Sequence, residues 1–153
     1  MNMLNLYPEV RIRLAPGALP PHYATLGAAG ADIRAYLPDV KKLTVPPLFT
    51  ITIPTGIFIE LPHGYEAQIR PRSGIAASAG ITILNSPGTI DSDYRGQIKI
   101  LLQNTRNEPF VVSHGDRIAQ MVISPVIRGT FMISESLSDS ERGEGGFGST
   151  GTN

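Results

Sequence analysis

The chain of 153 residues has no cysteine, and only 17% of its residues are charged. The missing cysteine excludes disulfides, cysteine zinc sites and thiol catalysis. Thirteen basic and thirteen acidic residues cancel, so no basic face is available to bind DNA or RNA as a polymer. A single nucleotide needs only a few local cations and stays open as a ligand. The low charge is also a weak sign that part of the surface is buried in an oligomer.

Long apolar runs and targeting segments are missing as well. No apolar run reaches 18 residues, so no membrane span is expected. Residues 1–17 lack the charged-then-apolar order of a secretory signal, and we expect a cytoplasmic protein. The three histidines, His22, His63 and His114, show no ligand spacing. No direct protein ligand for a metal is therefore predicted, and any metal would arrive on a substrate, as Mg²⁺ does with triphosphates.

What is present is a series of short alternating apolar and polar stretches separated by glycine and proline. This period of two predicts an all-β sandwich or barrel. The predicted strands span residues 10–14, 49–53, 57–61, 81–84, 97–100, 118–123 and 130–133. The small, alanine-rich stretch 73–79 predicts one short helix, which Ser73 would cap and Gly80 would end. We expect a single β domain over residues 1–133 and a flexible arm over 134–153.

The last twelve residues, RGEGGFGSTGTN (142–153), leave two interpretations open. Free backbone N–H groups, hydroxyls and Arg142 suit phosphate oxygens, and the lone Phe147 could stack on a flat ring. The segment would then be a mobile arm that orders over a nucleotide. Alternatively it is a frayed terminus without a role. A P-loop is disfavoured, because Ser149 stands where the lysine belongs and no helix can follow.

The segment NSPGTIDSDYRG (85–96) is the densest polar cluster, and its Pro-Gly turn between strands predicts a β-hairpin. Its residues are ordinary turn residues, which is one explanation. Two carboxylates, a tyrosine and an arginine within five residues exceed what a turn needs. An aspartate such as Asp91 can orient and deprotonate a water, and exposed backbone groups can pair with the edge of a base.

Three further positions are candidates with ordinary alternatives. Arg72 and Ser73 lie where a strand meets the short helix, so they form either a plain N-cap or an anion site. Gln120 shares an apolar strand face and either satisfies a structural role or contacts a ligand. Asp32 and Arg34 share one strand face, where a surface ion pair is the simplest explanation.

Five segments, in this order, resemble the signature motifs of the trimeric dUTP pyrophosphatases, or dUTPases. They are AGADIRA (29–35), PRSGIA (71–76), NSPGTIDSDYRG (85–96), GDRIAQMVI (115–123) and RGEGGFGSTG (142–151). The resemblance implies a jelly-roll-like β subunit in a homotrimer, with active sites between subunits and an arm that closes a neighbour's site. It also implies Mg²⁺-dependent hydrolysis of dUTP to dUMP and pyrophosphate. That reaction keeps uracil out of DNA and supplies dUMP for dTMP synthesis.

The resemblance assigns roles around the base and the sugar. Asp91 would activate water for in-line attack on the α-phosphorus. Tyr94 would pack against the deoxyribose and exclude a 2′-hydroxyl. The uracil would be recognised by Asn85 and by the backbone around Thr89, Ile90 and Asp91.

It also assigns roles around the triphosphate. The phosphates, and the water around Mg²⁺, would be held by Arg72, Ser73, Gly74 and Gln120. Asp32 would support Mg²⁺-bound water or a subunit contact. Lys99 lies on the strand expected to contact substrate through its backbone. The arm would contribute Arg142 and Ser149 at the γ-phosphate and Phe147 over uracil, with Gly148 beside them.

The departures from the family pattern are small: Ala31 replaces a bulkier residue, and 77–79 lacks a lysine common after the second motif. Two alternatives stay open. One is a dCTP deaminase-related enzyme, which shares the fold and part of the third motif. The other is a catalytically inactive nucleotide-binding protein on the same scaffold.

Overall fold

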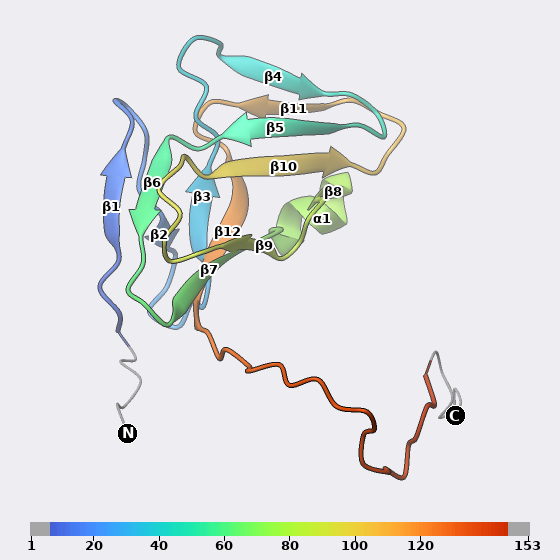
Figure 1. Cartoon of the computed structure of the whole chain (residues 1–153). Helices are drawn as coiled ribbons and strands as arrows, with labels where there is room; N and C mark the ends of the chain where they lie inside the picture. The colour runs from blue at the N-terminus through green and yellow to red at the C-terminus, as the bar shows by residue number, and fades with distance from the viewer. Residues whose placement is uncertain (1–6, 147–153) are drawn as a thin grey trace.

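The computed structural model describes residues 7–146 and is built from β-strands with one short helix (Figure 1), which confirms the predicted fold class. The strands are β1 (Arg11–Leu14), β2 (His22–Tyr23), β3 (Ala31–Arg34), β4 (Lys42–Val45), β5 (Thr50–Pro54), β6 (Ile57–Glu60), β7 (Tyr65–Arg70), β8 (Ile81–Ile83), β9 (Gly88–Ile90), β10 (Lys99–Asn104), β11 (Phe110–Ser113) and β12 (Arg117–Pro125). The helix is α1 (Ser73–Ala79). No helix within residues 7–146 is long and apolar enough to cross a membrane.

The strands form four sheets and no closed barrel in the described part of the chain. The largest sheet has the order β2-β3-β12-β7-β9, and a second has the order β5-β10-β8. Two strand pairs, β1-β6 and β11-β4, complete the fold. In Figure 1, β4, β11, β5 and β10 lie across the upper part of the molecule, above β3, β12 and β7. The large sheet carries Asp32 on β3, Gln120 on β12, and Thr89 and Ile90 on β9.

A core of β-branched and leucine side chains fills the space between the sheets. Isoleucine dominates it because alternating isoleucines suit a half-buried pleated strand. The fully buried apolar residues include Ile33, Val45, Ile53, Ile57, Ile81, Ile98, Ile100, Leu102 and Val112. Two polar residues, Thr55 and Asn104, are also fully buried. The Thr55 hydroxyl donates to the Ile98 carbonyl at 2.7 Å, so its burial is compensated.

The helix forms where predicted, but its start differs from the prediction. Arg72, with an extended backbone, is the N-cap and makes no side-chain cap hydrogen bond, whereas Ser73 is already the first helical residue. The prediction that Ser73 caps the helix is therefore wrong. Gly80 ends the helix in the left-handed conformation with φ 64°, as predicted, because glycine adopts it without a Cβ penalty.

The predicted hairpin over residues 85–96 is confirmed only in part. The strands on its two sides, β8 and β10, pair antiparallel, but the segment between them is not a simple turn. Within it β9 pairs with β7, so the chain crosses from one sheet to another and back. Burial explains the crossing. Ile81 and Ile83 bury their side chains from the β10 sheet, and Gly88 packs close to Ile69 in the large sheet.

The strand predicted over 130–133 does not form. After β12 the chain runs away from the body as an extended segment (Figure 1), and Phe131, Met132 and Ile133 are almost fully exposed. The local alternation is present, but a strand needs a hydrogen-bonding neighbour. No strand of the described residues pairs with this segment.

Candidate functional site

Asp32 is the centre of a charged group on the outer face of the large sheet. Its two carboxylate oxygens accept from two arginines: Oδ1 from Arg72 Nε at 2.8 Å and Oδ2 from Arg117 Nη1 at 3.1 Å. The Asp32 side chain is only 12% exposed, so these bonds compensate a carboxylate that is largely removed from water. They hold Arg72 at the end of β7, directly before α1.

Gln120 joins the same group. It pairs in register with Asp32 on one side and with Arg70 on the other. Its Nε2 donates to the Pro71 carbonyl at 2.9 Å, and its side chain lies so close to Gly30 that a Cβ at Gly30 would collide with it. The sequence left open whether Gln120 is structural or contacts a ligand. Its amide nitrogen has a structural partner, which supports the residue before Arg72.

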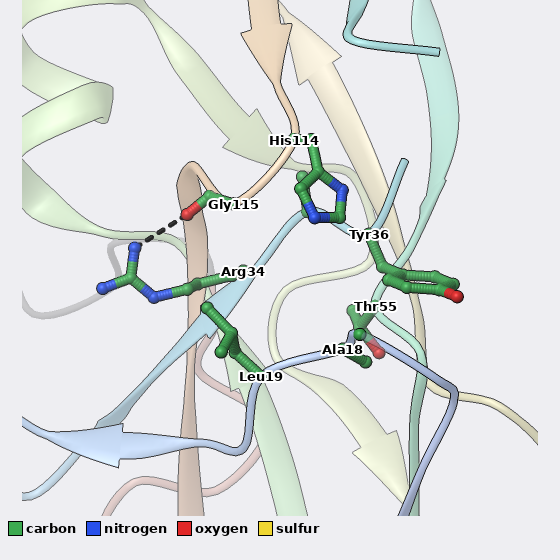
Figure 2. Close-up of a pocket in the computed structure, with 9 residues that line it drawn as sticks. Ala18, Leu19, Arg34, Tyr36, Thr55, His114 and Gly115 are labelled. Atoms are coloured by element: carbon green, nitrogen blue, oxygen red, sulfur yellow. Dashed lines mark hydrogen bonds between the residues drawn. The ribbon is translucent and has the colours of Figure 1, made fainter. Parts of the chain in front are cut away.

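The predicted ion pair between Asp32 and Arg34 is wrong. Arg34 Nη1 instead donates to the Gly115 carbonyl at 2.7 Å (Figure 2), because Asp32 is already occupied by two other arginines. Tyr36 and His114 lie beside this contact and enclose a cavity of only about 10 Å³. A space of that size holds about one water and no nucleotide.

A larger cavity of about 290 Å³ opens next to the Asp32 group. Its wall has a cationic part and an apolar part. The lining residues are Arg34, Arg72, Ile75, Phe110, Gly115, Asp116, Arg117 and Ile118. The wall holds three arginines and one aspartate, and Asp32 bonds two of these arginines, so a net positive charge remains that favours an anion there.

The second candidate group lies in residues 85–99. Thr89 and Ile90 belong to β9, the far edge of the same sheet, whereas Lys99 is the exposed first residue of β10 in the three-stranded sheet. Asn85 Nδ2 would lie 3.2 Å from a Cβ at Gly88, so Asn85 packs over the start of β9. Asp91 is exposed, and among the described residues its carboxylate has no hydrogen-bond or ion-pair partner.

Tyr94 is fixed by its own loop. Its backbone N–H donates to the Asp91 carbonyl at 3.1 Å, and its hydroxyl donates to the Gln97 carbonyl at 3.1 Å. The ring lies against Gly96, where any Cβ would collide with it. Tyr94 as a residue is nevertheless 43% exposed, so its ring presents a flat surface near Asp91.

The two groups are separate within one chain. No hydrogen bond or ion pair of the described residues joins the Asp32 group to residues 85–99. Asp32 lies on β3 and Thr89 on β9, which are three strand steps, or roughly 14 Å, apart. Arg72 follows β7, the direct neighbour of β9, but the antiparallel register puts Asp91 toward the opposite end of β7 from Arg72.

Comparison with known proteins decides the family. A family profile described as dUTPase matches residues 18–151. The chain belongs to the dUTPase family.

Relatives and solved structures agree with this assignment. The deoxyuridine 5′-triphosphate nucleotidohydrolase of Treponema pallidum is 58% identical over 143 residues, which cover 94% of this chain and 97% of that protein. The enzyme of the same name from Roseobacter denitrificans is 56% identical and covers 86% of each chain. The dUTPase of Staphylococcus bacteriophage 80alpha, solved with dUpNHpp, is 27% identical with a TM-score of 0.83. The match covers 94% of this chain and 98% of the phage protein.

Of the residues implied by resemblance to dUTPases, the structure brings Asp32, Arg72 and Gln120 together and keeps residues 85–99 apart from them. Ser73 and Gly74 follow Arg72 as the exposed first turn of α1. Arg142 Nε donates to the Gly145 carbonyl at 2.7 Å in an exposed turn. The predicted arm contacts Phe147, Gly148 and Ser149 lie outside the described residues.

Arg117 was missed by the sequence analysis. It lies inside the fourth dUTPase motif, but its role depends on reaching a carboxylate 85 residues away in sequence. The strand pairing of the first and fourth motifs places Arg117 opposite Arg34 and near Asp32, but this pairing is a tertiary contact that local alternation does not reveal.

Proposed function

We propose that this chain hydrolyses dUTP, the activity named for its relatives, and that the products are dUMP and pyrophosphate. The observation that carries the proposal is the arrangement of Arg72 and Gln120 around Asp32, beside a cavity with a cationic wall. Triphosphate hydrolysis needs mainly positioning and charge stabilisation. Arg72, held by Asp32 and flanked by Arg117, supplies both the positioning and the positive charge.

In the proposed reaction, the phosphates bind at Arg72, Ser73, Gly74 and Gln120. Arg72 keeps donors besides Nε for phosphate oxygens, because its ion pair with Asp32 uses that one nitrogen. The backbone N–H groups of Ser73 and Gly74 belong to the first turn of α1 and have no partner within the helix. Pairing with phosphate would satisfy them.

Asp91 is the proposed general base. It takes a proton from a water whose oxygen forms a bond to the α-phosphorus. The bond from the α-phosphorus to the oxygen bridging to the β-phosphorus breaks, and pyrophosphate leaves. The absence of an internal partner for Asp91 in the described residues supports this role, because a carboxylate already bonded to the protein is less available to water.

Recognition of the nucleoside is proposed for the same segment. The exposed backbone of Thr89, Ile90 and Asp91, with Asn85, would hydrogen-bond the edge of uracil, and the β10 backbone at Lys99 would contact the substrate. The ring of Tyr94 would lie against deoxyribose and exclude UTP by steric conflict. Unpaired polar groups at the backbone would exclude dCTP, and penalties of that kind are large.

Mg²⁺ fits this site as a companion of the triphosphate. In residues 7–146, no three His, Asp or Glu side chains gather in a way that could hold a metal ion. Mg²⁺ commonly keeps several waters and binds through one or two carboxylates plus substrate phosphates. Asp32 and Gln120 carry the oxygens that would accept from those waters, and the ion would neutralise phosphate charge.

The proposed assembly is a homotrimer whose active sites combine residues of different subunits. The separation of the Asp32 group from residues 85–99 supports it, because one chain alone does not gather the implied residues. Arg142, Phe147, Gly148 and Ser149 would close the site as an arm from residues 134–153. Closure would exclude bulk water from the reaction. The cytoplasmic location predicted from the sequence remains part of this proposal.

The test is release of pyrophosphate and of ammonia from dUTP, dCTP, dTTP and UTP, each with Mg²⁺. Pyrophosphate from dUTP alone, without ammonia, is the expected result. Ammonia from dCTP would assign the chain to the deaminase-related branch. Tight binding of dUTP without any turnover would instead identify an inactive nucleotide-binding protein.

A further inference from the structure

Helix α1 has few stabilising interactions of its own. It has only seven residues, none of them fully buried, and it has no side-chain N-cap and no basic residue in its last turn. Ile75 and Ala79 are partly buried against the core. Helices this short are stable only through tertiary contacts. Because α1 begins directly after Arg72, whatever fixes α1 also fixes the residues proposed to bind phosphate.

The loop after β10 supplies the missing contacts at the C-terminal end of α1. Arg106 Nη2 donates to the Ala77 carbonyl at 3.2 Å. Thr105 donates twice to the Gly80 carbonyl, from its backbone N–H at 3.0 Å and from its hydroxyl at 2.8 Å. A cation at the C-terminal carbonyls of a helix is favourable, since those carbonyls carry partial negative charge.

The loop after β10 also packs tightly against Gly80. A Cβ at Gly80 would lie 2.8 Å from Arg106 Cγ and 2.9 Å from Thr105 Oγ1. Gly80 therefore has two reasons to be glycine: its left-handed φ of 64° and the loop packed directly on it.

The loop that carries Arg106 is itself anchored to the core. Asn104 is fully buried, and its Oδ1 accepts from the Arg106 N–H at 2.9 Å while its Nδ2 donates to the Glu108 carbonyl at 2.7 Å. On the other side, the Arg106 carbonyl accepts from the N–H of Leu48 at 3.2 Å. Leu48 has a φ of 61°, a conformation that a bulky residue adopts only when its surroundings impose it. The loop is thus a rigid support for α1.

We propose that Arg106 is a positioning residue that holds α1 from its C-terminal end and thereby places Arg72, Ser73 and Gly74 for the substrate phosphates. The Arg72 carbonyl accepts from the Ala76 N–H at 3.1 Å, so the phosphate-side residues and the helix form one hydrogen-bonded unit. Arg106 supplies from the loop the cation that the helix lacks. This inference rests on the proposed function, in which those three residues contact phosphate.

The experiment compares two ligands that differ in their phosphates. Binding of dUpNHpp, the imido analogue of dUTP, and of dUMP is measured by calorimetry for the wild type and Arg106→Ala. Amide exchange of α1 is followed in the same proteins without nucleotide. Arg106→Lys keeps the cation, Arg128→Ala removes an exposed arginine elsewhere, and Ser78→Lys added to Arg106→Ala returns a cation to the last turn of the helix itself. Ser78→Lys alone serves as the control for that rescue.

Arg106→Ala should weaken dUpNHpp binding about three- to tenfold and speed α1 exchange by a similar factor, the size expected for a lost helix-terminal cation and hydrogen bond. The affinity of Arg106→Ala for dUMP should stay within about twofold of the wild-type affinity, and Arg128→Ala should bind both ligands like the wild type. Arg106→Lys should keep most of the dUpNHpp affinity, and Ser78→Lys added to Arg106→Ala should restore most of it. Unchanged dUpNHpp affinity in Arg106→Ala, or equal losses for both ligands, would overturn the role of Arg106. A wild-type chain that binds neither nucleotide would overturn the proposed function instead, and the exchange data would still report whether Arg106 holds α1 in place.

Discussion

Two aspartates, Asp32 on β3 and Asp91 directly after β9, illustrate how differently the two halves of the candidate site are built. Asp32 is 12% exposed, and both of its carboxylate oxygens are bonded to arginine. Asp91 is exposed and has no partner among the described residues. The first half is internally bonded, so its side chains are placed before any ligand arrives. The second half leaves its reactive carboxylate available.

The two aspartates should therefore affect different properties: Asp32 the stability of the fold and Asp91 catalysis. Loss of a bonded, largely buried carboxylate leaves two arginines without their partner, which lowers the stability of the fold. Loss of an exposed carboxylate without partners should leave the fold intact and affect only chemistry. Four predictions follow this contrast from its largest expected effect to its smallest.

Asp91→Asn should lower turnover of dUTP by about three orders of magnitude, because removal of a general base costs that much. Binding of dUpNHpp and the thermal midpoint should stay near wild-type values. Steady-state kinetics measure the turnover, and calorimetry measures the binding of dUpNHpp and the thermal midpoint. Asp39→Asn removes another exposed carboxylate and should be silent. Substantial turnover by Asp91→Asn would take the base role away from Asp91.

Removal of residues 142–153 should lower kcat/KM by about two orders of magnitude, since the donors of the arm and the exclusion of water would be lost together. The oligomer, measured by light scattering, should remain intact. A chain lacking only residues 150–153 is the matched control and should keep most of its activity. Near-normal rates in the longer truncation would make the C-terminal segment a tail without a role.

Asp32→Asn should lower the free energy of unfolding by about 2 kcal/mol, because two charge-assisted hydrogen bonds are weakened at a mostly buried position. Denaturant titration against Asp91→Asn tests the contrast directly, and Asp91→Asn should change stability by less than about 0.5 kcal/mol. Equal losses of stability in Asp32→Asn and Asp91→Asn would contradict the contrast between a bonded Asp32 and an Asp91 without partners.

Tyr94→Ala should narrow the preference for dUTP over UTP by about tenfold in kcat/KM, because the ring that excludes the 2′-hydroxyl is gone. Tyr94→Phe loses only the bond from the hydroxyl to the Gln97 carbonyl and should keep the preference. A preference that survives in Tyr94→Ala would place sugar selection elsewhere in residues 85–99.

The sequence predicted those parts of the fold that depend on local pattern. Alternating apolar residues located β1, β5, β6, β8 and β12, and the stretch predicted at 97–100 overlapped β10 only at its first two residues. Alternation did not locate β2, β3, β4, β7, β9 or β11. The alanine-rich stretch located α1, and Gly80 located its end. The same pattern failed at residues 130–133, because alternation marks a strand-forming segment but supplies no neighbour to pair with. The hairpin prediction correctly paired the strands on either side of residues 85–96, β8 and β10, but alternation could not show that β9 between them pairs with β7 in another sheet.

The candidate site divides in the same way. The motif resemblance named Asp32, Arg72 and Gln120, and the structure brings them together. It did not indicate that Asp32 is shared with Arg117, or that Arg34 turns to the Gly115 carbonyl. Those choices depend on which side chains meet across β3, β12 and the end of β7. The sequence did not indicate Arg106 for the same reason, because its partner, the Ala77 carbonyl, lies 29 residues away in sequence.

The central claim is that the two halves of one active site come from different copies of the chain, and subunit mixing tests it most directly. Arg72→Ala and Asp91→Asn are each expected to be inactive, and the two are unfolded together in equal amounts and refolded. If the halves come from different subunits, random assortment leaves about a quarter of the sites with neither substitution, and pyrophosphate release should return to about that level. If both halves come from the same chain, every site carries one substitution, and a mixture that stays inactive would contradict the account.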